Sequence, residues 1–145
     1  MKLYYSIGAC SLSPHIALRE AGLDFTLEKV DLKSKQIGSG GDIRTENPKG
    51  MVPVLVLESG EVLTEGPAIV QWIADQKPDS GLAPPCGTMA RYHLMEWLNF
   101  VTSELHKTYS PLFNPDAPEA YKTIARATLT ERYAFVEEKL AGKSY

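Results

Sequence analysis

The chain has 145 residues, of which 43% are hydrophobic and 23% are charged. These values are ordinary for a folded domain and exclude a disordered chain. Lys and Arg number 15 against 18 Asp and Glu, a net charge of -3, which excludes the strongly basic surface of a nucleic-acid binder. No apolar run approaches the ~20 residues of a membrane-spanning helix, and no signal peptide precedes the first predicted strand. We therefore expect a cytoplasmic protein that binds neither nucleic acid nor membrane.

Four short apolar runs in the first part of the chain predict β-strands. They cover residues 3–7, 25–32, 52–57 and 61–64. Ser59-Gly60 separates the last two runs, a connection that is typical of a β-hairpin. A helical segment between the first two strands predicts that those strands are parallel. The pattern therefore indicates a small mixed sheet.

Proline and glycine mark the predicted helices of this part. Ser11 or Ser13 can cap a helix that has Pro14 in its first turn, and Gly22 is expected to end it. The polar loop over residues 33–50 has room for a helical turn. A further helix follows the hairpin, so the predicted order is β-α-β-α-β-β-α.

Beyond residue 77 the composition changes. Residues 78–87 are rich in proline and glycine, which is typical of a linker, and no strand pattern follows them. We therefore predict an α/β domain over residues 1–77, a linker over 78–87, and the first part of an all-α domain over 88–145.

Two long helices are predicted in the second domain. Thr88 is expected to cap the first, which runs to about Tyr109 before Pro111 breaks it. The second is expected to begin at a capping box, Asp116-Ala117-Pro118-Glu119, and to stop at Gly142. Two helices form at most a hairpin, which cannot enclose its own apolar faces. We expect the first domain, a second subunit or further chain to cover them.

Cys10 is the sharpest local feature of the sequence. It lies between a strand end and a helix start, where backbone N–H groups and the helix dipole favour a thiolate, so its pKa is expected to fall below that of a free cysteine. It is equally consistent with a small packing residue. Cys10 and Cys86 are too few for a disulfide scaffold and lack the spacing of metal ligands, so we expect no metal.

Pro53 lies between two valines inside an apolar run. Because proline cannot donate to a sheet ladder, it belongs on an edge or at a bend. A cis Val52-Pro53 bond would turn the backbone N–H and C=O of Val52 toward a ligand. The simpler interpretation is a trans proline on an edge strand, since cis bonds are about 5–6% of X–Pro bonds.

Other polar residues allow a functional and a simpler interpretation. Glu65, just outside a helix start, could hold the ammonium of a ligand whose carboxylate binds the helix end, or could merely cap that helix. Asn99 and His106 lie seven residues apart, hence two turns apart on one face of the predicted helix, with Glu104 near them. They could border a cleft or form a solvated face. Lys35 is most simply a solvated charge.

Taken together, these motifs resemble the bacterial beta class of glutathione transferases over all 145 residues. The matching segments are Tyr5, Gly8-Ala9-Cys10-Ser11, Asn47-Pro48-Lys49-Gly50-Met51-Val52-Pro53, Leu63-Thr64-Glu65-Gly66, and Asn99 with Glu104-Leu105-His106-Lys107. The resemblance implies a thioredoxin-like glutathione-binding domain followed by an all-α domain. Because the helical domain of that family continues for several more helices, we expect this chain to be truncated.

The resemblance also implies catalytic roles. Cys10 would face the sulfur of glutathione and could form a mixed disulfide with it. His106 would approach the same sulfur from the helical domain. Tyr5 occupies the place where other classes of the family keep a catalytic tyrosine.

Binding roles follow from the same resemblance. Val52 would pair its backbone with the cysteinyl part of glutathione, with Pro53 in the cis form. Glu65 and Gly66 would hold the γ-glutamyl end, and Glu104 would reach that end from the other subunit. The remaining residues expected to border the site are Ala9, Ser11, Lys35, Met51, Asn99 and Lys107.

The implied function is conjugation of glutathione to small hydrophobic electrophiles by a homodimer in detoxification. Cys10 would add a glutathione-dependent thiol-transfer, reductase or peroxidase activity. The alternative is a non-catalytic module of the same fold that binds glutathione or a protein partner.

Overall fold

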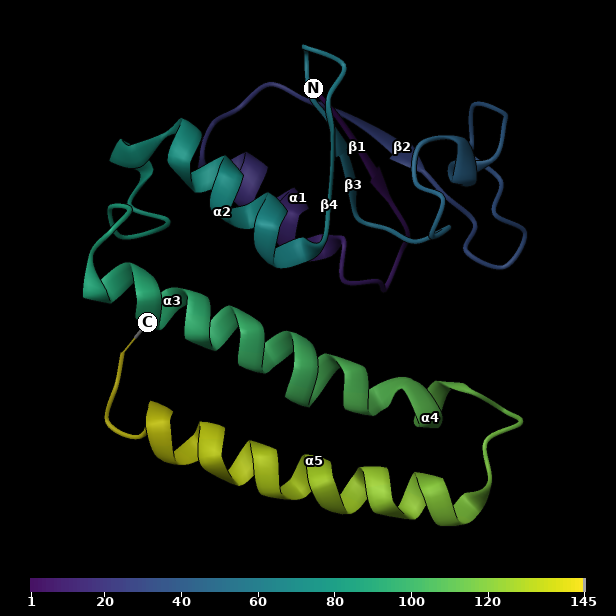
Figure 1. The fold of residues 1–145 in the computed structure, drawn as a ribbon, viewed down its shortest axis with the longest axis vertical. Coiled ribbons are helices and arrows are strands. Elements are labelled where there is room, and N and C mark those ends of the chain that lie inside the picture. Colours follow the sequence, from purple (N-terminus) through teal and green to yellow (C-terminus); the bar gives the residue numbers. More distant parts are fainter. Residues whose placement is uncertain (145) are drawn as a thin grey trace. The chain divides into compact units, whose positions relative to one another are not determined.

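The computed structural model describes residues 1–144. It divides into two compact units, Met1–Leu94 and Met95–Tyr145. The boundary between them falls within one helix, α3 (Met89–Phe100) (Figure 1). The predicted domain boundaries, with a linker over residues 78–87, stay a prediction.

A four-stranded mixed sheet forms the centre of the first unit. Its strands are β1 (Lys2–Tyr5), β2 (Thr26–Lys29), β3 (Val54–Val56) and β4 (Val62–Thr64). They lie in the order β2-β1-β3-β4, with β1 and β2 parallel and the other pairs antiparallel. This confirms the predicted thioredoxin-like mixed sheet and its hairpin. The strands are shorter than the apolar runs that predicted them, because paired backbone stops before the flanking turns.

The two faces of the sheet bury different sets of side chains. Alternation along β1 sends Leu3 to one face and Tyr4 to the other. Helices α1 (Leu12–Glu20) and α2 (Gly66–Gln76) cover the Leu3 face (Figure 1). The loop between β2 and β3 covers the Tyr4 face, and its single 3₁₀ turn, η1 (Ile43–Thr45), is the helical turn expected between these strands.

The ends of the first helices follow the sequence in part. Pro14 lies in the first turn of α1, and Gly22 follows its C-terminus with φ 63°. The Gly22 N–H donates to Arg19, and this closing turn favours glycine. Ser11 holds the N-cap position of α1, but its hydroxyl makes no cap bond. Glu65 likewise makes no cap bond at α2, so the simpler interpretation of Glu65 as a helix cap was wrong.

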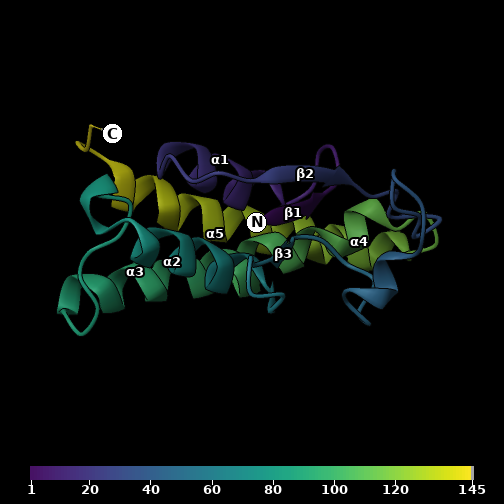
Figure 2. The same ribbon diagram turned by 90° about the horizontal axis from the view of Figure 1, so that it is seen from above.

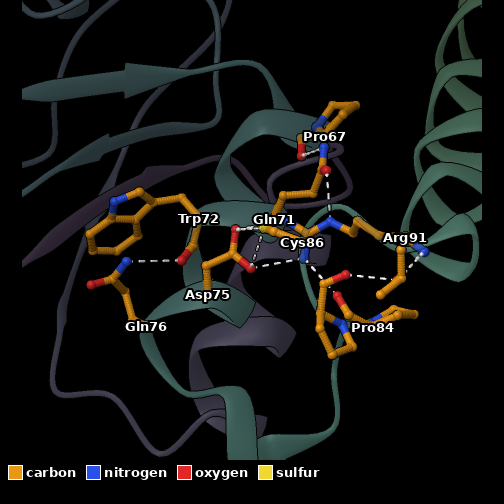
Figure 3. Close-up of polar contacts among 10 residues, drawn as sticks. Pro67, Gln71, Trp72, Asp75, Gln76, Pro84, Cys86 and Arg91 are labelled. Atoms are coloured by element: carbon orange, nitrogen blue, oxygen red, sulfur yellow. Dashed lines mark hydrogen bonds and ion pairs between the residues drawn. The ribbon is translucent and has the colours of Figure 1, made fainter.

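A buried arginine ties the start of helix α3 (Met89–Phe100) to α2 within the first unit. The Nη1 and Nη2 atoms of Arg91 each donate to Asp75 at 2.8 Å. Arg91 also donates to the carbonyl of Pro84, beyond the 3₁₀ turn η2 (Pro78–Ser80), and to Gln71 (Figure 3). Thr88 accepts a hydrogen bond from the Arg91 N–H, so it caps α3 as predicted. These contacts join α2, the proline-rich segment and α3 through one guanidinium.

The second unit consists of helical segments only. A π-helix, η3 (Val101–His106), a 3₁₀ turn, η4 (Lys107–Tyr109), and α4 (Ser110–Phe113) follow α3 without a break, and α5 (Glu119–Leu140) lies beside η3, η4 and α4 (Figure 2). Pro111 does not end this run of helical segments. It lies in the first turn of α4, where the missing N–H of proline is not needed as a donor. The expected capping box was also wrong, since Pro118 holds the N-cap position of α5 and makes no side-chain cap bond.

Aromatic packing joins the two helical paths of the second unit. The rings of Trp97, Phe100 and Phe135 lie with centroids 5.4 to 5.9 Å apart. Leu105, Ala125 and Leu129 are buried in the same unit. Within residues 1–144, no helix combines the length and apolar character that crossing a membrane requires.

Candidate functional site

The sheet topology gathers the N-terminal candidate residues at one edge. Strand β3 is antiparallel to both β1 and β4, so β1 and β4 end where β3 begins. Cys10 follows the end of β1, Val52-Pro53 directly precedes β3, and Glu65 directly follows β4. Segments that are far apart in the sequence therefore bring a thiol, a free stretch of backbone and a carboxylate to the same edge.

The Cys10 thiol is directed at the backbone of Val52. Its Sγ donates to the Val52 carbonyl oxygen at 3.5 Å. Partial burial is the largest influence on this group and raises the pKa of Cys10, and the Glu65 carboxylate adds to the rise. Hydrogen bonds from the backbone N–H groups of Cys10 and Ser11 offset this only in part. The expected fall of the Cys10 pKa was therefore wrong, because desolvation outweighs the helix start.

The segment before β3 presents its backbone at this edge. The Val52-Pro53 bond is cis, as the resemblance implied, and the simpler trans interpretation was wrong. Val52 and Pro53 precede the first paired residue of β3, and the Val52 N–H has no hydrogen-bond acceptor within residues 1–144. Asn47, only 2% exposed, donates to the Met51 carbonyl and holds this segment in place. The Val52 N–H is thus free to pair with an extended peptide, as a strand edge would, whereas the Val52 carbonyl already accepts from the Cys10 thiol.

The Glu65 carboxylate forms an ion pair with a lysine side chain. Its Oε1 accepts a hydrogen bond from Lys49 Nζ, which also donates to Thr64 Oγ1 at 3.0 Å. Glu65 has φ 70° and ψ 118°, a conformation that is rare outside glycine. Gly66 is the first residue of α2, so its N–H is one of the helix donors that lack an intrahelical partner. A carboxylate and free N–H donors therefore lie side by side, as recognition of a zwitterion requires.

Other candidates in the first unit have structural contacts of their own. Lys35 Nζ donates to the Gly50 carbonyl at 2.9 Å, so it is not a simple solvated charge. The buried Ser11 hydroxyl bonds both the N–H and the carbonyl of Ser6, and thereby fixes the turn that precedes Cys10. The Tyr5 ring lies 6.4 Å from the His15 ring. The two other candidates of this unit are Ala9, which directly precedes Cys10, and Met51, which is 60% exposed.

The second unit holds the remaining candidates on or beside its π-helix. Asn99, His106 and Lys107 are exposed, whereas Glu104 accepts a hydrogen bond from Arg132 Nε on α5 at 3.0 Å. The expectation that Asn99 and His106 share a face assumed a regular α-helix. A π turn takes one residue more than an α turn, so the helix phase changes between them and a seven-residue spacing no longer preserves the face.

Hydroxyl side chains bond back to the helix backbone around the π-helix. Thr102 Oγ1 donates to the Leu98 carbonyl, and Ser103 Oγ to the Asn99 carbonyl, at 2.9 and 3.1 Å. Thr108 Oγ1 does the same to Glu104 at 2.7 Å. Such bonds compete with the backbone pattern of an α-helix.

The contacts of two residues at the edge of the sheet were not predicted from the sequence. Lys49 and Asn47 were quoted only as parts of a motif, yet one holds the Glu65 carboxylate and the other shapes the Val52 segment. The predicted hairpin between residues 52–57 and 61–64 was a usable signal for Lys49. Pairing these strands brings the residues that precede the first close to those that follow the second.

No group of three or more His, Cys, Asp or Glu side chains gathers as metal ligands in the part of the chain that the structure describes. The chemistry available at the edge of the sheet is instead that of a thiol, a peptide edge and a zwitterion-binding carboxylate. This combination suits a small peptide with a free amino group.

Comparisons with known proteins agree with this chemistry. Residues 8–76 match the family "Glutathione S-transferase, N-terminal domain". The chain is 51% identical over 140 residues to glutathione S-transferase GstA of Escherichia coli O157:H7, covering 97% of this chain and 70% of that protein.

Two solved structures are also similar over nearly the whole chain. A sphingomonad glutathione S-transferase complexed with glutathione is 50% identical with a TM-score of 0.95, covering 99% of this chain and 71% of that one. A beta-class enzyme of Sphingomonas chungbukensis is 48% identical with a TM-score of 0.95, covering 100% and 72%. The chain therefore belongs to the glutathione S-transferase family, and its structural relatives include bacterial beta-class members.

Proposed function

We propose that this protein binds glutathione and transfers its sulfur to small apolar electrophiles. The proposal rests on one observation: the free Val52 N–H, the Cys10 thiol on the Val52 carbonyl and the Glu65 carboxylate that pairs with Lys49 meet at one edge of the sheet. The Val52 N–H and C=O would bind the cysteinyl backbone, while Glu65 and the Gly66 N–H would bind the ammonium and carboxylate of the γ-glutamyl end. Similarity to a transferase complexed with glutathione supports glutathione as the ligand.

In the transfer step, the thiolate of glutathione attacks an electrophilic carbon, and the group displaced there leaves with the electron pair. The protein contributes by holding that sulfur beside donors that stabilise its negative charge. Cys10 is the donor nearest to the Val52 backbone. Tyr5 is proposed to contribute to the surroundings of the sulfur, and the roles expected of Asn99, His106 and Lys107 stay predictions.

A second activity involves Cys10 directly. The Cys10 thiolate would attack the glutathione sulfur of a mixed disulfide, forming a Cys10–glutathione disulfide and releasing the other thiol, which takes up a proton. A second glutathione thiolate would then attack this disulfide, releasing oxidised glutathione and restoring Cys10. The raised pKa of Cys10 makes this step slow at neutral pH, because only the thiolate is nucleophilic.

We further propose that the protein acts as a cytoplasmic homodimer in detoxification. Three large apolar side chains on α3, Met89, Tyr92 and Met95, are 42 to 67% exposed, and burial against a second copy would remove them from water. In such a dimer Glu104 would lie near the γ-glutamyl end of the glutathione held by the other copy.

Titration of the protein with glutathione in a calorimeter tests the proposed function. The protein is expected to bind glutathione, and Glu65→Gln to weaken binding about tenfold, because a hydrogen bond to a charged group contributes about 1.5–3 kcal/mol and the exposed site lies at the low end. Ser59→Ala is the control, since Ser59 lies in the hairpin turn at the opposite end of β4. Absence of binding would instead favour an interaction module that shares the fold.

A further inference from the structure

The cation that contacts the Glu65 carboxylate is the side chain of Lys49, a residue of the same protein. Lys49 Nζ donates to Glu65 Oε1 and to Thr64 Oγ1. Both partners of this ion pair are accessible to water, with 47% of the Lys49 side chain and 65% of the Glu65 side chain exposed. A primary ammonium therefore already occupies the carboxylate that the proposed function assigns to the ligand.

A lysine side chain and the α-amino group of a γ-glutamyl peptide present the same group to a carboxylate. Each is a primary ammonium with three N–H donors and a single positive charge. Two such groups at one carboxylate oxygen would repel each other. We propose that Lys49 competes with the ligand ammonium for Glu65, so that glutathione binds by displacing it. This inference rests on the proposed function and adds a residue that sets the affinity of that site.

The backbone around Lys49 explains how its side chain reaches Glu65. The Lys49 N–H donates to Asn47 Oδ1 at 3.2 Å, and the Gly50 N–H to the Asn47 carbonyl at 2.8 Å, which fixes the turn. Pairing of Val54 with Thr64 brings this turn beside the residues that follow β4. Hydrogen bonds hold the turn, whereas the lysine stem has several rotatable bonds and is half exposed, so the ammonium can leave without moving the backbone.

The size of the effect follows from the exposure of the pair. Exposed ion pairs stabilise by at most about 1 kcal/mol, which corresponds to a factor of about five in an equilibrium constant. A ligand that must displace Lys49 loses that factor. Lys49→Met keeps an unbranched stem and removes the ammonium, so glutathione is expected to bind the variant about two- to fivefold more tightly.

Calorimetric titrations of the wild type, Lys49→Met and a matched control test this inference. Lys77→Met removes the same charge at the opposite end of α2, about 16 Å along the helix, and is expected to bind like the wild type. A second probe is glutathione without its α-amino group, in which glutaric acid replaces glutamate. Lys49→Met is expected to bind this analogue no more tightly than the wild type does, because the analogue has no ammonium that must displace Lys49.

Each outcome of these titrations either supports or overturns competition between Lys49 and the ligand. Tighter binding of glutathione alone supports competition at Glu65. Unchanged binding means that the ion pair does not oppose the ligand, and weaker binding means that Lys49 itself holds the ligand carboxylate, so either result overturns the inference while the proposed function stands. An equal gain for both probes also overturns it, since the ammonium would not matter. If neither the wild type nor Lys49→Met binds glutathione, the proposed function fails together with the inference.

Discussion

The ion pair between Arg91 and Asp75 offers a test of how the first unit is held together. Arg91 is 4% exposed and makes two hydrogen bonds of 2.8 Å to the Asp75 carboxylate, whose side chain is 40% exposed. Asp75→Asn keeps the shape of the side chain and removes its charge. The buried guanidinium then loses its counter-charge. It also loses one of its two hydrogen bonds, because the NH2 group of the asparagine cannot accept.

The expected cost lies between two limits. Breaking a fully buried ion pair costs about 3–5 kcal/mol, whereas an exposed pair contributes about 0–1 kcal/mol. Here water reaches one partner, and Arg91 keeps its bonds to Gln71 at 3.3 Å and to the Pro84 carbonyl at 3.1 Å. We therefore expect Asp75→Asn to lower the free energy of unfolding of the first unit by about 2 kcal/mol at pH 7.

Urea unfolding followed by tryptophan fluorescence measures this cost. Trp72 packs against the core of the first unit, so a Trp97→Phe background makes it the reporter. With a slope of about 2 kcal/mol per molar urea, the midpoint is expected to fall by about 1 M. Asp79→Asn, a nearby exposed aspartate, is the control and is expected to leave the midpoint unchanged. A loss below about 0.5 kcal/mol would refute the reasoning, since the pair would then behave like an exposed one.

The pH dependence of this loss has a definite sign. Hydrogen bonds from Arg91 hold the pKa of Asp75 below its ordinary value of 3.8. A carboxyl with a lowered pKa stabilises the fold above its unfolded pKa, and this contribution disappears as the pH falls through the folded value. The difference between the wild type and Asp75→Asn is therefore expected to be complete at pH 7 and to shrink below about pH 4.

Two further substitutions test the surroundings of the thiol. Cys10→Ser is expected to abolish glutathione-dependent reduction of a small aliphatic disulfide and to lower conjugation of an aryl halide no more than a few fold; retained disulfide reduction would exclude Cys10 as the nucleophile. Ser11→Ala leaves the Ser6 N–H and carbonyl without their hydroxyl partner and is expected to cost about 1–2 kcal/mol in urea unfolding, whereas an unchanged midpoint would show that water replaces the hydroxyl.

Patterns that depend on neighbouring residues predicted the fold well. The apolar runs located all four strands, and Gly22 follows the end of α1 as predicted. These features depend on local backbone geometry, which proline and glycine restrict or permit directly. The convergence of Cys10, Val52 and Glu65 followed from the strand order, since alternating directions place their segments at one edge.

Features that depend on distant partners were missed or mistaken. Glu65 was expected to cap α2 in its simpler interpretation, but Lys49, sixteen residues earlier, takes its carboxylate. Pro111 was expected to end a helix that in fact tolerates it, because the proline falls in a first turn, where its missing N–H is not needed. Sequence spacing alone does not show which long side chain reaches which charge.

The error on Cys10 bears on the chemistry of the site. The helix-start rule considers only groups that stabilise the thiolate, whereas the Val52 carbonyl accepts from the thiol and the Glu65 carboxylate repels its anion. Cys10 is therefore held as a neutral hydrogen-bond donor in the absence of glutathione. A neutral donor stabilises a neighbouring sulfur anion without competing with it for electrophiles, and serine can serve in the same way. For this reason Cys10→Ser separates the two proposed activities, removing thiol transfer while largely preserving conjugation.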